Sequence, residues 1–375
     1  MIAMTRYGFG LPSYRLQALQ ASLHVPLPDA TQWDIIRKAL PAPRCVHAEL
    51  IRQAAQAPLL YCDDTPMRVL PPNKQANKPG KTAQAAQAAQ AAGPSGAPGE
   101  LNAVCAAVCE VITEATPKAV LKGTRTTCIV AQAPKYEVVL YFTGHAHAGQ
   151  NMEKVLAQRA PERAPVLQMC DALAANTAGD FITVLCHCLS HGRRQVVDVL
   201  EQFPEQGRHV LQALGRVYFH DQHCREQRFD AAQRLEHHRT HSGPLMQELK
   251  AWIEQRLEQR EVEPNSGLGK ALKYLLRHWT ELTMFLRHAG APLDNNLCEQ
   301  MIKRAILHRK GSMFYKTPAG AEAGDIYMSL IHTCVRCGQN VFDYLQALHR
   351  NAPAVMDNPG QWLPWNWRQA PVPEG

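Results

Sequence analysis

The chain has 375 residues, of which 46% are hydrophobic and 19% charged, and its formal net charge is +7. This balance fits a folded protein of two or three domains, excludes an intrinsically disordered chain and is compatible with an anionic partner. The start, MIAMTRYGFGLPSYR, has no signal-peptide pattern, and no apolar run is long enough to span a membrane. We therefore expect a cytoplasmic protein with no membrane partner, whose 12 cysteines are reduced thiols.

Two helices are predicted near the N-terminus. Residues 12–22 (PSYRLQALQAS) and 31–40 (TQWDIIRKAL) have apolar residues at helical spacing, and a proline-containing turn, HVPLPDA, joins them. The pattern fits a DNA-binding helix-turn-helix. Two helices of an ordinary α-helical subdomain explain it equally well.

Two predicted strands each run into an aspartate. The segment APLLYCDDTPMRVL is apolar up to Tyr61 and then reaches Asp63, and APVLQMCDAL reaches Asp171. Between them in the chain lie a predicted antiparallel pair, TRTTCIVAQ and KYEVVLYFTG, and a helix, AGQNMEKVLAQRA. A further strand, DFITVLCHCL, follows Asp171. This order predicts an α/β fold.

A third carboxylate, Glu299, lies at the start of a predicted basic helix in APLDNNLCEQMIKRAILHRKGSMFY. Carboxylates held together on neighbouring strands repel one another and resist burial unless cations lie between them. Mg²⁺ prefers oxygen ligands, and two such ions can clamp the attacking and leaving oxygens of a displacement at phosphorus. Asp63, Asp171 and Glu299 are therefore candidate ligands of two Mg²⁺ ions, for which Mn²⁺ is the alternative.

Each carboxylate also has an ordinary structural explanation. Asp63 can belong to a strand-to-turn transition, and Asp171 can cap the following helix. Asn296 and Glu299 have the spacing of a capping box, with Asn in place of Ser or Thr. The pattern by itself does not decide between these explanations and a metal site.

The cysteines next to the carboxylates suggest a thiolate metal site, but we do not favour this interpretation. Adjacent strand residues point to opposite faces, so Cys62 and Cys170 are better explained as small buried neighbours, as is Cys298. Cys188 and His191 form a C-x-x-H pair without a convincing second pair, which favours a local structural or site-lining role. Basic residues near the candidate site either contact DNA phosphates or form a solvated face: Arg193, Arg194, Lys303, Arg304, Arg309 and Lys310.

Several stretches together resemble the transposases of the insertion sequence 66 (IS66) family. They include DDTPMRVL, YFTGHAHAGQN, QMCDAL, CLSHGRRQ and MSLIHTCVRCGQNVFDYL, and the strongest is APLDNNLCEQMIKRAILHRKGSMFYKT. The resemblance runs from about Tyr7 to Trp367. The family motif D-N-N-x-x-E, followed by an R-K pair and an aromatic residue, is specific in combination.

This resemblance implies a ribonuclease-H-like mixed sheet flanked by helices, with a large α-helical insertion. The first aspartate of the family's D-E-T-P motif falls on Asp63, the second aspartate on Asp171 and the glutamate on Glu299. Cys188 and His191 match a C-x-x-H signature, and further residues are expected to support the site: Asp294, Asn295 and Asn296. The family's D-E-T is D-D-T here, and its final Glu-Arg is Glu299-Gln300.

The predicted domain division follows from the same patterns. It comprises a helical region (1–45), the first part of the core (46–70 and 123–192), a low-complexity insertion rich in alanine and glutamine (71–122), an α-helical insertion domain (193–290), the final part of the core with the catalytic helix (291–345) and a Trp/Pro-rich C-terminal tail (346–375).

The resemblance implies a bacterial DNA transposase, nucleoid-associated in the cytoplasm. We expect metal-dependent cleavage at the element ends and strand transfer by attack of the exposed 3′ hydroxyl on target DNA. Expected partners are the terminal inverted repeats, target DNA, further copies of the chain on DNA and small accessory proteins of the same element. The alternatives are an inactive or truncated remnant that only binds DNA, and a ribonuclease-H-like nuclease that cuts without joining.

Overall fold

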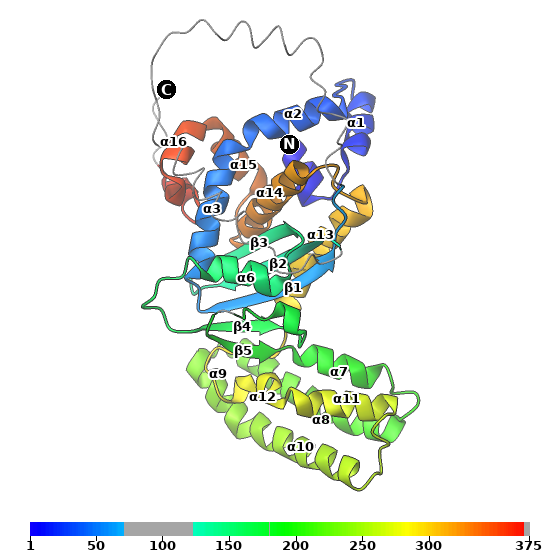
Figure 1. The fold of residues 1–375 in the computed structure, drawn as a ribbon. Coiled ribbons are helices and arrows are strands. Elements are labelled where there is room, and N and C mark those ends of the chain that lie inside the picture. The colour runs from blue at the N-terminus through cyan, green and yellow to red at the C-terminus, as the bar shows by residue number, and fades with distance from the viewer. Residues whose placement is uncertain (71–122, 180, 371–375) are drawn as a thin grey trace, which may run out of the picture.

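The structure is a computed structural model that describes residues 1–70, 123–179 and 181–370. Its centre is a five-stranded mixed sheet in the order β3-β2-β1-β4-β5, with helices around it (Figure 1). The strands are β1 (Leu59–Pro66), β2 (Arg125–Gln132), β3 (Glu137–Gly144), β4 (Val166–Cys170) and β5 (Thr183–His187). The predicted α/β class, a mixed sheet flanked by helices, is confirmed.

The sheet has an antiparallel half and a parallel half. β1 pairs antiparallel with β2, which pairs antiparallel with β3, whereas β1, β4 and β5 run parallel to one another. β4 is buried along its whole length, as expected for the apolar run VLQMC in a covered parallel sheet. Because parallel strands end at the same edge, the carboxyl ends of β1, β4 and β5 lie together.

The first strand is longer than its apolar run indicates. We predicted a strand that ends at Asp63, but β1 continues past Asp63 and Asp64 to Pro66. The reason is pairing with β2, in which Asp63 lies opposite Cys128 and Asp64 opposite Thr127. Asp171, in contrast, follows the last residue of β4 directly, as predicted.

Helices cover both faces of the sheet. α3 (Pro41–Ala55) and α6 (Ala148–Leu156) lie on one face, and α13 (Asn296–Ser312) packs against β1 and β2 from the other (Figure 1). α13 presents to the sheet a stripe of buried residues that includes Cys298, Met301, Ile302 and Ala305.

The open edge of β3 is closed by side chains of α14 (Pro318–Arg336). The backbone N–H groups of Val139, Tyr141 and Thr143 donate to Thr333 Oγ1 at 2.9 Å, Ser329 Oγ at 2.9 Å and Asp325 Oδ2 at 2.6 Å. The three acceptors are spaced four residues apart, so one face of a helix satisfies alternate donors of the strand. An edge strand that would otherwise attract another strand is thereby covered.

The two predicted N-terminal helices are present as α1 (Ser13–Ser22) and α2 (Asp29–Ala39). Buried Gln32 connects them, because its Nε2 donates to Leu27 O at 2.9 Å and to Gln20 Oε1 at 3.3 Å. Nothing in this geometry distinguishes a helix-turn-helix from an ordinary helix pair, and that interpretation stays a prediction.

A helical part extends beyond the β5 edge of the sheet (Figure 1). It is formed by α7 (Leu189–Val197), α8 (Pro204–Glu226), α9 (Ala231–His237), α10 (Gly243–Glu258), α11 (Gly267–Arg277) and α12 (Trp279–Leu282). Beyond the opposite side lie α15 (Val341–Arg350) and α16 (Ala352–Asp357). The chain then packs onto the core, with Trp362 and Leu363 buried and Trp365 stacked on Tyr136.

The predicted alanine-glutamine insertion, residues 71–122, lies outside the described residues. Across the ranges that are described, no helix is both long and apolar enough to cross a membrane.

Candidate active site at the carboxyl ends of the parallel strands

Three carboxylates from three elements lie near one another. Asp63 comes from β1, Asp171 from the residue after β4, and Glu299 from the first turn of α13. All three side chains are partly buried. The charges of Asp171 and Glu299 both act on Asp63, so the structure brings the predicted residues into one acidic cluster.

The Asp63 carboxyl group has an unusual proton affinity. Burial is the main cause that raises its pKa, to about 7, and repulsion by Asp171, Glu299 and Asp64 adds to it. A hydrogen bond from the Asp64 N–H to Asp63 Oδ1, at 2.8 Å, acts in the opposite direction. This carboxyl therefore keeps its proton to higher pH than an exposed aspartate does.

The three carboxylates do not meet as closely as two other groups of potential metal ligands among the described residues. Only two groups of three potential ligands among the described residues have all their ligand atoms within 4.8 Å of one another. These groups are Cys188, His191 and Glu299, and, separately, His187, His278 and Glu281. Asp63, Asp171 and Glu299 together do not form such a group.

Asp171 is oriented by the loop that follows it. Its Oδ1 accepts from Leu173 N at 3.3 Å and from Asn176 Nδ2. Asn176 is itself buried and is fixed by Gln168, whose Nε2 donates to Asn176 O at 2.7 Å. The sequence interpretation missed Asn176, because an asparagine in a short loop has no pattern that identifies its partner.

Glu299 has one carboxylate oxygen without a hydrogen-bond partner in the described structure. This oxygen, Oε1, is buried and lies 3.8 Å from His191 Nδ1, while Arg194 Nη2 lies 3.9 Å from Oε2. Both distances are too long for hydrogen bonds. A buried carboxylate oxygen without a hydrogen bond normally requires a further hydrogen-bonding or ionic partner. Arg194, predicted as a DNA contact, thus also lies beside Glu299.

The start of α13 differs from the predicted capping box. Asn296 is the first helical residue and does not cap, and the cap residue Asn295 makes no side-chain capping bond. Instead, Asp294 Oδ1 accepts from Asn296 N at 3.1 Å, and Asp294 Oδ2 accepts from Asn296 Nδ2 at 2.9 Å. The predicted cap was wrong because the helix begins one residue earlier than a cap at Asn296 requires.

Asn295 connects the helix to the strand ends. It is fully buried, its Nδ2 donates to Cys62 O at 3.0 Å, and its backbone N–H donates to Cys188 Sγ at 3.2 Å. A further hydrogen bond, from Leu189 N to Leu293 O at 2.9 Å, joins the start of α7 to the segment before α13. Asn295 therefore fixes Glu299 relative to the residue before Asp63.

Asp64 has a structural role on the other face of the sheet. Its carboxylate accepts from Thr127 Oγ1 at 2.6 Å and from Ala148 N, at the start of α6, at 2.9 Å. His147 Nδ1 lies 3.4 Å from the same carboxylate. Because neighbouring strand residues point to opposite faces, Asp63 and Asp64 have separate environments.

The cysteines that precede the carboxylates are buried, as predicted: Cys62, Cys170 and Cys298. The pKa of Cys62 is raised well above its usual value by the neighbouring Cys170 thiol and by burial, and that of Cys298 is raised by burial. Cys188 is also buried, which raises its pKa to about 11. The raised pKa values of Cys62, Cys188 and Cys298 disfavour thiolates at these three positions.

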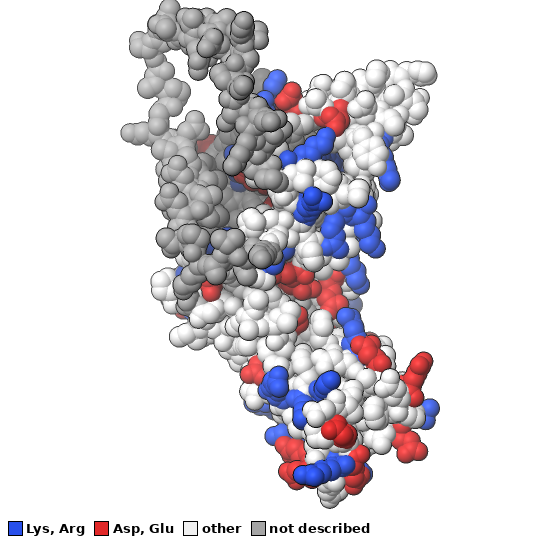
Figure 2. Space-filling model, turned by 45° about the vertical axis from the view of Figure 1, so that its right-hand side comes forward, with Lys and Arg blue, Asp and Glu red and all other residues white. Residues whose placement is uncertain are grey.

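Exposed basic side chains lie on the two helices that flank the cluster: Arg193 and Arg194 on α7, and Lys303, Arg304 and Lys310 on α13. Arg309 differs, since it is half-buried and its Nη1 donates to Thr65 Oγ1 at 3.0 Å and to Pro66 O. Figure 2 shows Asp and Glu side chains gathered at mid-height on this side of the molecule, with Lys and Arg side chains above them.

Fold and site together define a mixed α/β protein with an acidic cluster at the ends of parallel strands and basic helices beside it. The chain belongs to the IS66 family of transposases: the family model described as "Transposase IS66 family" matches residues 1–130 and 122–323.

Curated relatives come from Sinorhizobium fredii (strain NBRC 101917 / NGR234). The "Uncharacterized protein y4jD" is 33% identical over 190 residues, which cover 49% of this chain and 36% of the relative. The "Uncharacterized protein y4hP" is 24% identical over 214 residues, covering 53% of this chain and 38% of the relative. The chain thus spans well under half the length of the relatives it matches.

Proposed function

We propose that this protein is a DNA transposase with a ribonuclease-H-like core, in which Asp63, Asp171 and Glu299 bind two Mg²⁺ ions. Family membership supports the activity. The observation that favours the site most is the convergence of three carboxylates, two of which raise the proton affinity of Asp63. The strand order, three antiparallel strands continued by two parallel ones, supports the ribonuclease-H-like assignment.

The residues present fit hard divalent cations. An acidic cluster with a carboxyl pKa of about 7 and a buried, unpartnered oxygen on Glu299 lacks positive charge, and oxygen ligands suit Mg²⁺. The ligand atoms of the three carboxylates do not all lie within 4.8 Å of one another, which is compatible with two ions about 4 Å apart. When bound, such ions supply nucleophile activation and charge stabilisation for displacement at phosphorus, first by water and then by a 3′ hydroxyl.

Other residues of the chain hold the three carboxylates in place. Backbone pairing of β1 fixes Asp63, Asn176 orients Asp171, and Asn295 fixes the start of the helix that bears Glu299. Rigid ligands retain the geometry that the reaction requires. The protein forms no covalent intermediate in this scheme. Mn²⁺ is the expected substitute ion.

The flanking basic residues provide DNA affinity. Arg193, Arg194, Lys303, Arg304 and Lys310 are exposed and available to phosphates, whereas Arg309 also anchors α13 to the end of β1. Binding of element ends and target DNA, assembly of several copies on DNA and contact with accessory proteins are part of this proposal.

A protein that binds DNA without catalysis is the second candidate. The observation that favours it is the position of Arg194 within 4 Å of Glu299, where its positive charge can compensate the carboxylate without a metal ion. The same basic helices would then account for the function.

The test is cleavage and strand transfer of DNA that carries the element ends, with Mg²⁺. We expect Asp63→Asn, Asp171→Asn and Glu299→Gln each to lower both rates at least about a hundredfold, since each removes a metal ligand, while DNA binding persists. Asp198→Asn, the same substitution at an exposed aspartate after α7, is the matched control and should retain activity.

Each alternative has its own outcome. Wild-type protein that binds this DNA and neither cuts nor joins it would favour the binding protein. Cutting without joining would favour a nuclease. Full activity in any of the three variants would remove that residue from the proposed site.

A further inference from the structure

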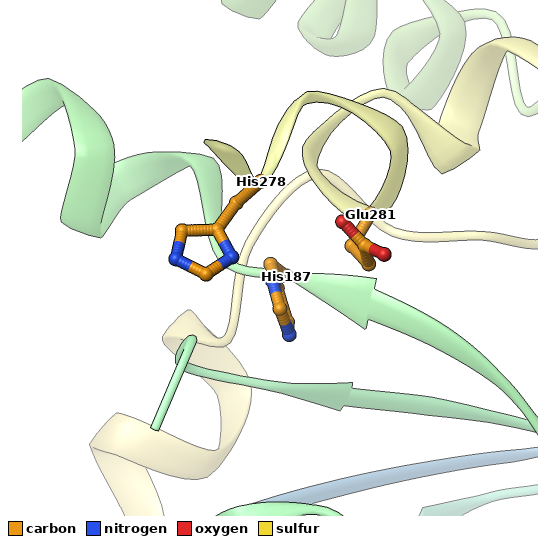
Figure 3. Close-up of side chains that lie close together, drawn as sticks. All are labelled: His187, His278 and Glu281. Atoms are coloured by element: carbon orange, nitrogen blue, oxygen red, sulfur yellow. The ribbon is translucent and has the colours of Figure 1, made fainter. Parts of the chain in front are cut away.

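A second group of potential metal ligands lies where the sheet meets the helical part. His187 is the last residue of β5, His278 follows α11 directly and Glu281 lies in α12. Their ligand atoms all lie within 4.8 Å of one another. Figure 3 shows the three side chains converging from these three elements.

Burial makes this convergence unusual. The His187 side chain is only 7% exposed, and its Nδ1 is buried without a hydrogen-bond partner among the described residues. The rings of His187 and His278 lie edge to face, with centroids 5.1 Å apart and planes at 70°. Buried ring nitrogens normally have a partner, and His187 lacks one within the described part of the chain.

We propose that His187, His278 and Glu281 form a binding site for a divalent transition-metal cation, best matched by Zn²⁺, that joins β5 to the α11–α12 junction. Two imidazoles and a carboxylate suit a borderline ion such as Zn²⁺, whereas Mg²⁺ prefers oxygen ligands alone. This site is therefore chemically distinct from the carboxylate cluster, and it does not depend on the proposed transposase activity.

The geometry requires only a small contraction. Zn–N bonds of about 2.0–2.1 Å in a tetrahedral site place neighbouring ligand atoms about 3.3 Å apart. His278 and Glu281 are partly exposed and lie at and beside a short helix, so their side chains can move inward while His187 stays fixed in the sheet. The group supplies three ligands, which leaves the fourth position to water.

The expected role is to fix the helical part to the strand end beside the carboxylate cluster. His187 lies opposite Cys170 in the β4–β5 pairing, and Asp171 is the next residue after Cys170. Asp171 is also close enough for its charge to act on His187. A cation bound to this group would therefore hold β5 and α12 together. Because Cys170, the pairing partner of His187, directly precedes Asp171, this contact lies next to a proposed catalytic residue.

Two other groups could bind Zn²⁺ and must be separated from this one. The first is Cys188, His191 and Glu299. The second is a histidine cluster on the helical part, in which His237 lies 5.4 Å from His220, 5.2 Å from His223 and 4.4 Å from His241 between ring centroids. Among the described residues of that cluster, no three ligand atoms lie within 4.8 Å of one another, as those of the group at β5 do.

The experiment is Zn²⁺ binding to the full chain, stripped of metal and titrated in competition with a chromophoric chelator. We expect His278→Ala and Glu281→Gln each to weaken Zn²⁺ affinity at least about tenfold. The controls His288→Ala, an exposed histidine on the same part of the chain, His191→Ala and His220→Ala should bind as wild type. Zn²⁺ should also raise the melting temperature of the wild type, but not of His278→Ala.

Co²⁺ in place of Zn²⁺ identifies the ligand type. We expect visible d–d bands without a thiolate-to-cobalt charge-transfer band, because the three ligands contain no sulfur. Unchanged affinity in both His278→Ala and Glu281→Gln would overturn the proposal. So would a thiolate band, or loss of binding in His191→Ala or His220→Ala.

Discussion

Asp63 is the residue on which the proposed chemistry depends most. Its pKa of about 7 is a consequence of burial, to which repulsion by two further carboxylates adds. A protein that keeps such a residue loses folding stability at neutral pH unless a ligand supplies positive charge. The same property that destabilises the free protein therefore suits the site to cations.

The first prediction concerns pH. Because the folded-state pKa of Asp63 lies above the unfolded value of 3.8, the folded protein binds the proton more tightly, and the free energy of unfolding falls as pH rises from about 4 to about 7. The variant Asp63→Asn should not show this fall in the free energy of unfolding, because its side chain does not ionise. Without divalent ions the variant should be more stable than wild type at pH 8, by roughly 2 kcal/mol after allowance for solvent, and equal to it near pH 4.

Urea denaturation across pH measures that difference. Asp325, whose pKa is also raised to about 7 by burial, gives the wild type a slope of the same sign, so only the difference between the two proteins reports on Asp63. A difference that is the same at every pH would contradict the assignment. Mg²⁺ should stabilise the wild type more than the variant.

Two adjacent asparagines give the next test. Asn295 is buried and donates to the backbone of β1, whereas Asn296 is exposed and bonds to Asp294. We expect Asn295→Ala to lower the free energy of unfolding by about 1–3 kcal/mol, since it removes the donor to Cys62 O, and Asn296→Ala to change it by less than about 0.5 kcal/mol. Equal losses on denaturation would show that Asn295 does not connect the helix to the strand.

α13 both packs on the sheet and carries Glu299, and the sequence predicted only some of the features that these two roles require. The spacing of its apolar residues indicates which side packs on the sheet, and Glu299 in its first turn lies near Asp63 of β1. The way the helix begins was not predictable, since it depends on contacts of Asp294 and Asn295 with their surroundings. Periodicity reports which face is buried, but not which neighbour each polar side chain meets.

The basic face of α13 gives a prediction about DNA. Lys303 and Lys310 follow Glu299 on the same side of the helix and are exposed. Replacing both with alanine should reduce the slope of log affinity against log salt concentration by about 2, because each lysine that neutralises a phosphate contributes about one unit. Lys273→Ala, an exposed lysine on α11, is the same-charge control. An unchanged slope in the double variant would assign DNA binding to another surface.

The sheet shows which features of the fold the sequence predicted and which it did not. The apolar runs identified all five strands of the described sheet, and Asp171 follows its strand as predicted. β1 was longer than predicted because the partner strand β2 pairs with Asp63 and Asp64, a tertiary effect that no local pattern records. The group at His187, His278 and Glu281 was missed for the same reason: His187 is distant in the chain from the other two, and His278 and Glu281 alone are only a pair of potential ligands.

The arrangement of the parts places the acidic cluster at a junction. The sheet lies between the helical part beyond β5 and the helices that cover β3 (Figure 1). The acidic cluster is near the carboxyl ends of the parallel strands. Two chain segments far apart in sequence, β1 and the start of α13, meet there through Asn295. The predicted domain division, which assigns them to two parts of one core, agrees with this contact and stays a prediction.

The most direct measurement is backbone cleavage by bound iron. Fe²⁺ that replaces Mg²⁺ reduces added hydrogen peroxide to hydroxide and a hydroxyl radical, and ascorbate returns the resulting Fe³⁺ to Fe²⁺. The radicals cut the chain near the ion, and the fragments identify those positions. We predict cuts next to Asp63, Asp171 and Glu299 in the same sample, all suppressed by excess Mg²⁺ and all absent from Asp63→Asn. Cuts near only one or two of these residues, or cuts confined to His187 and Glu281, would contradict the shared metal site.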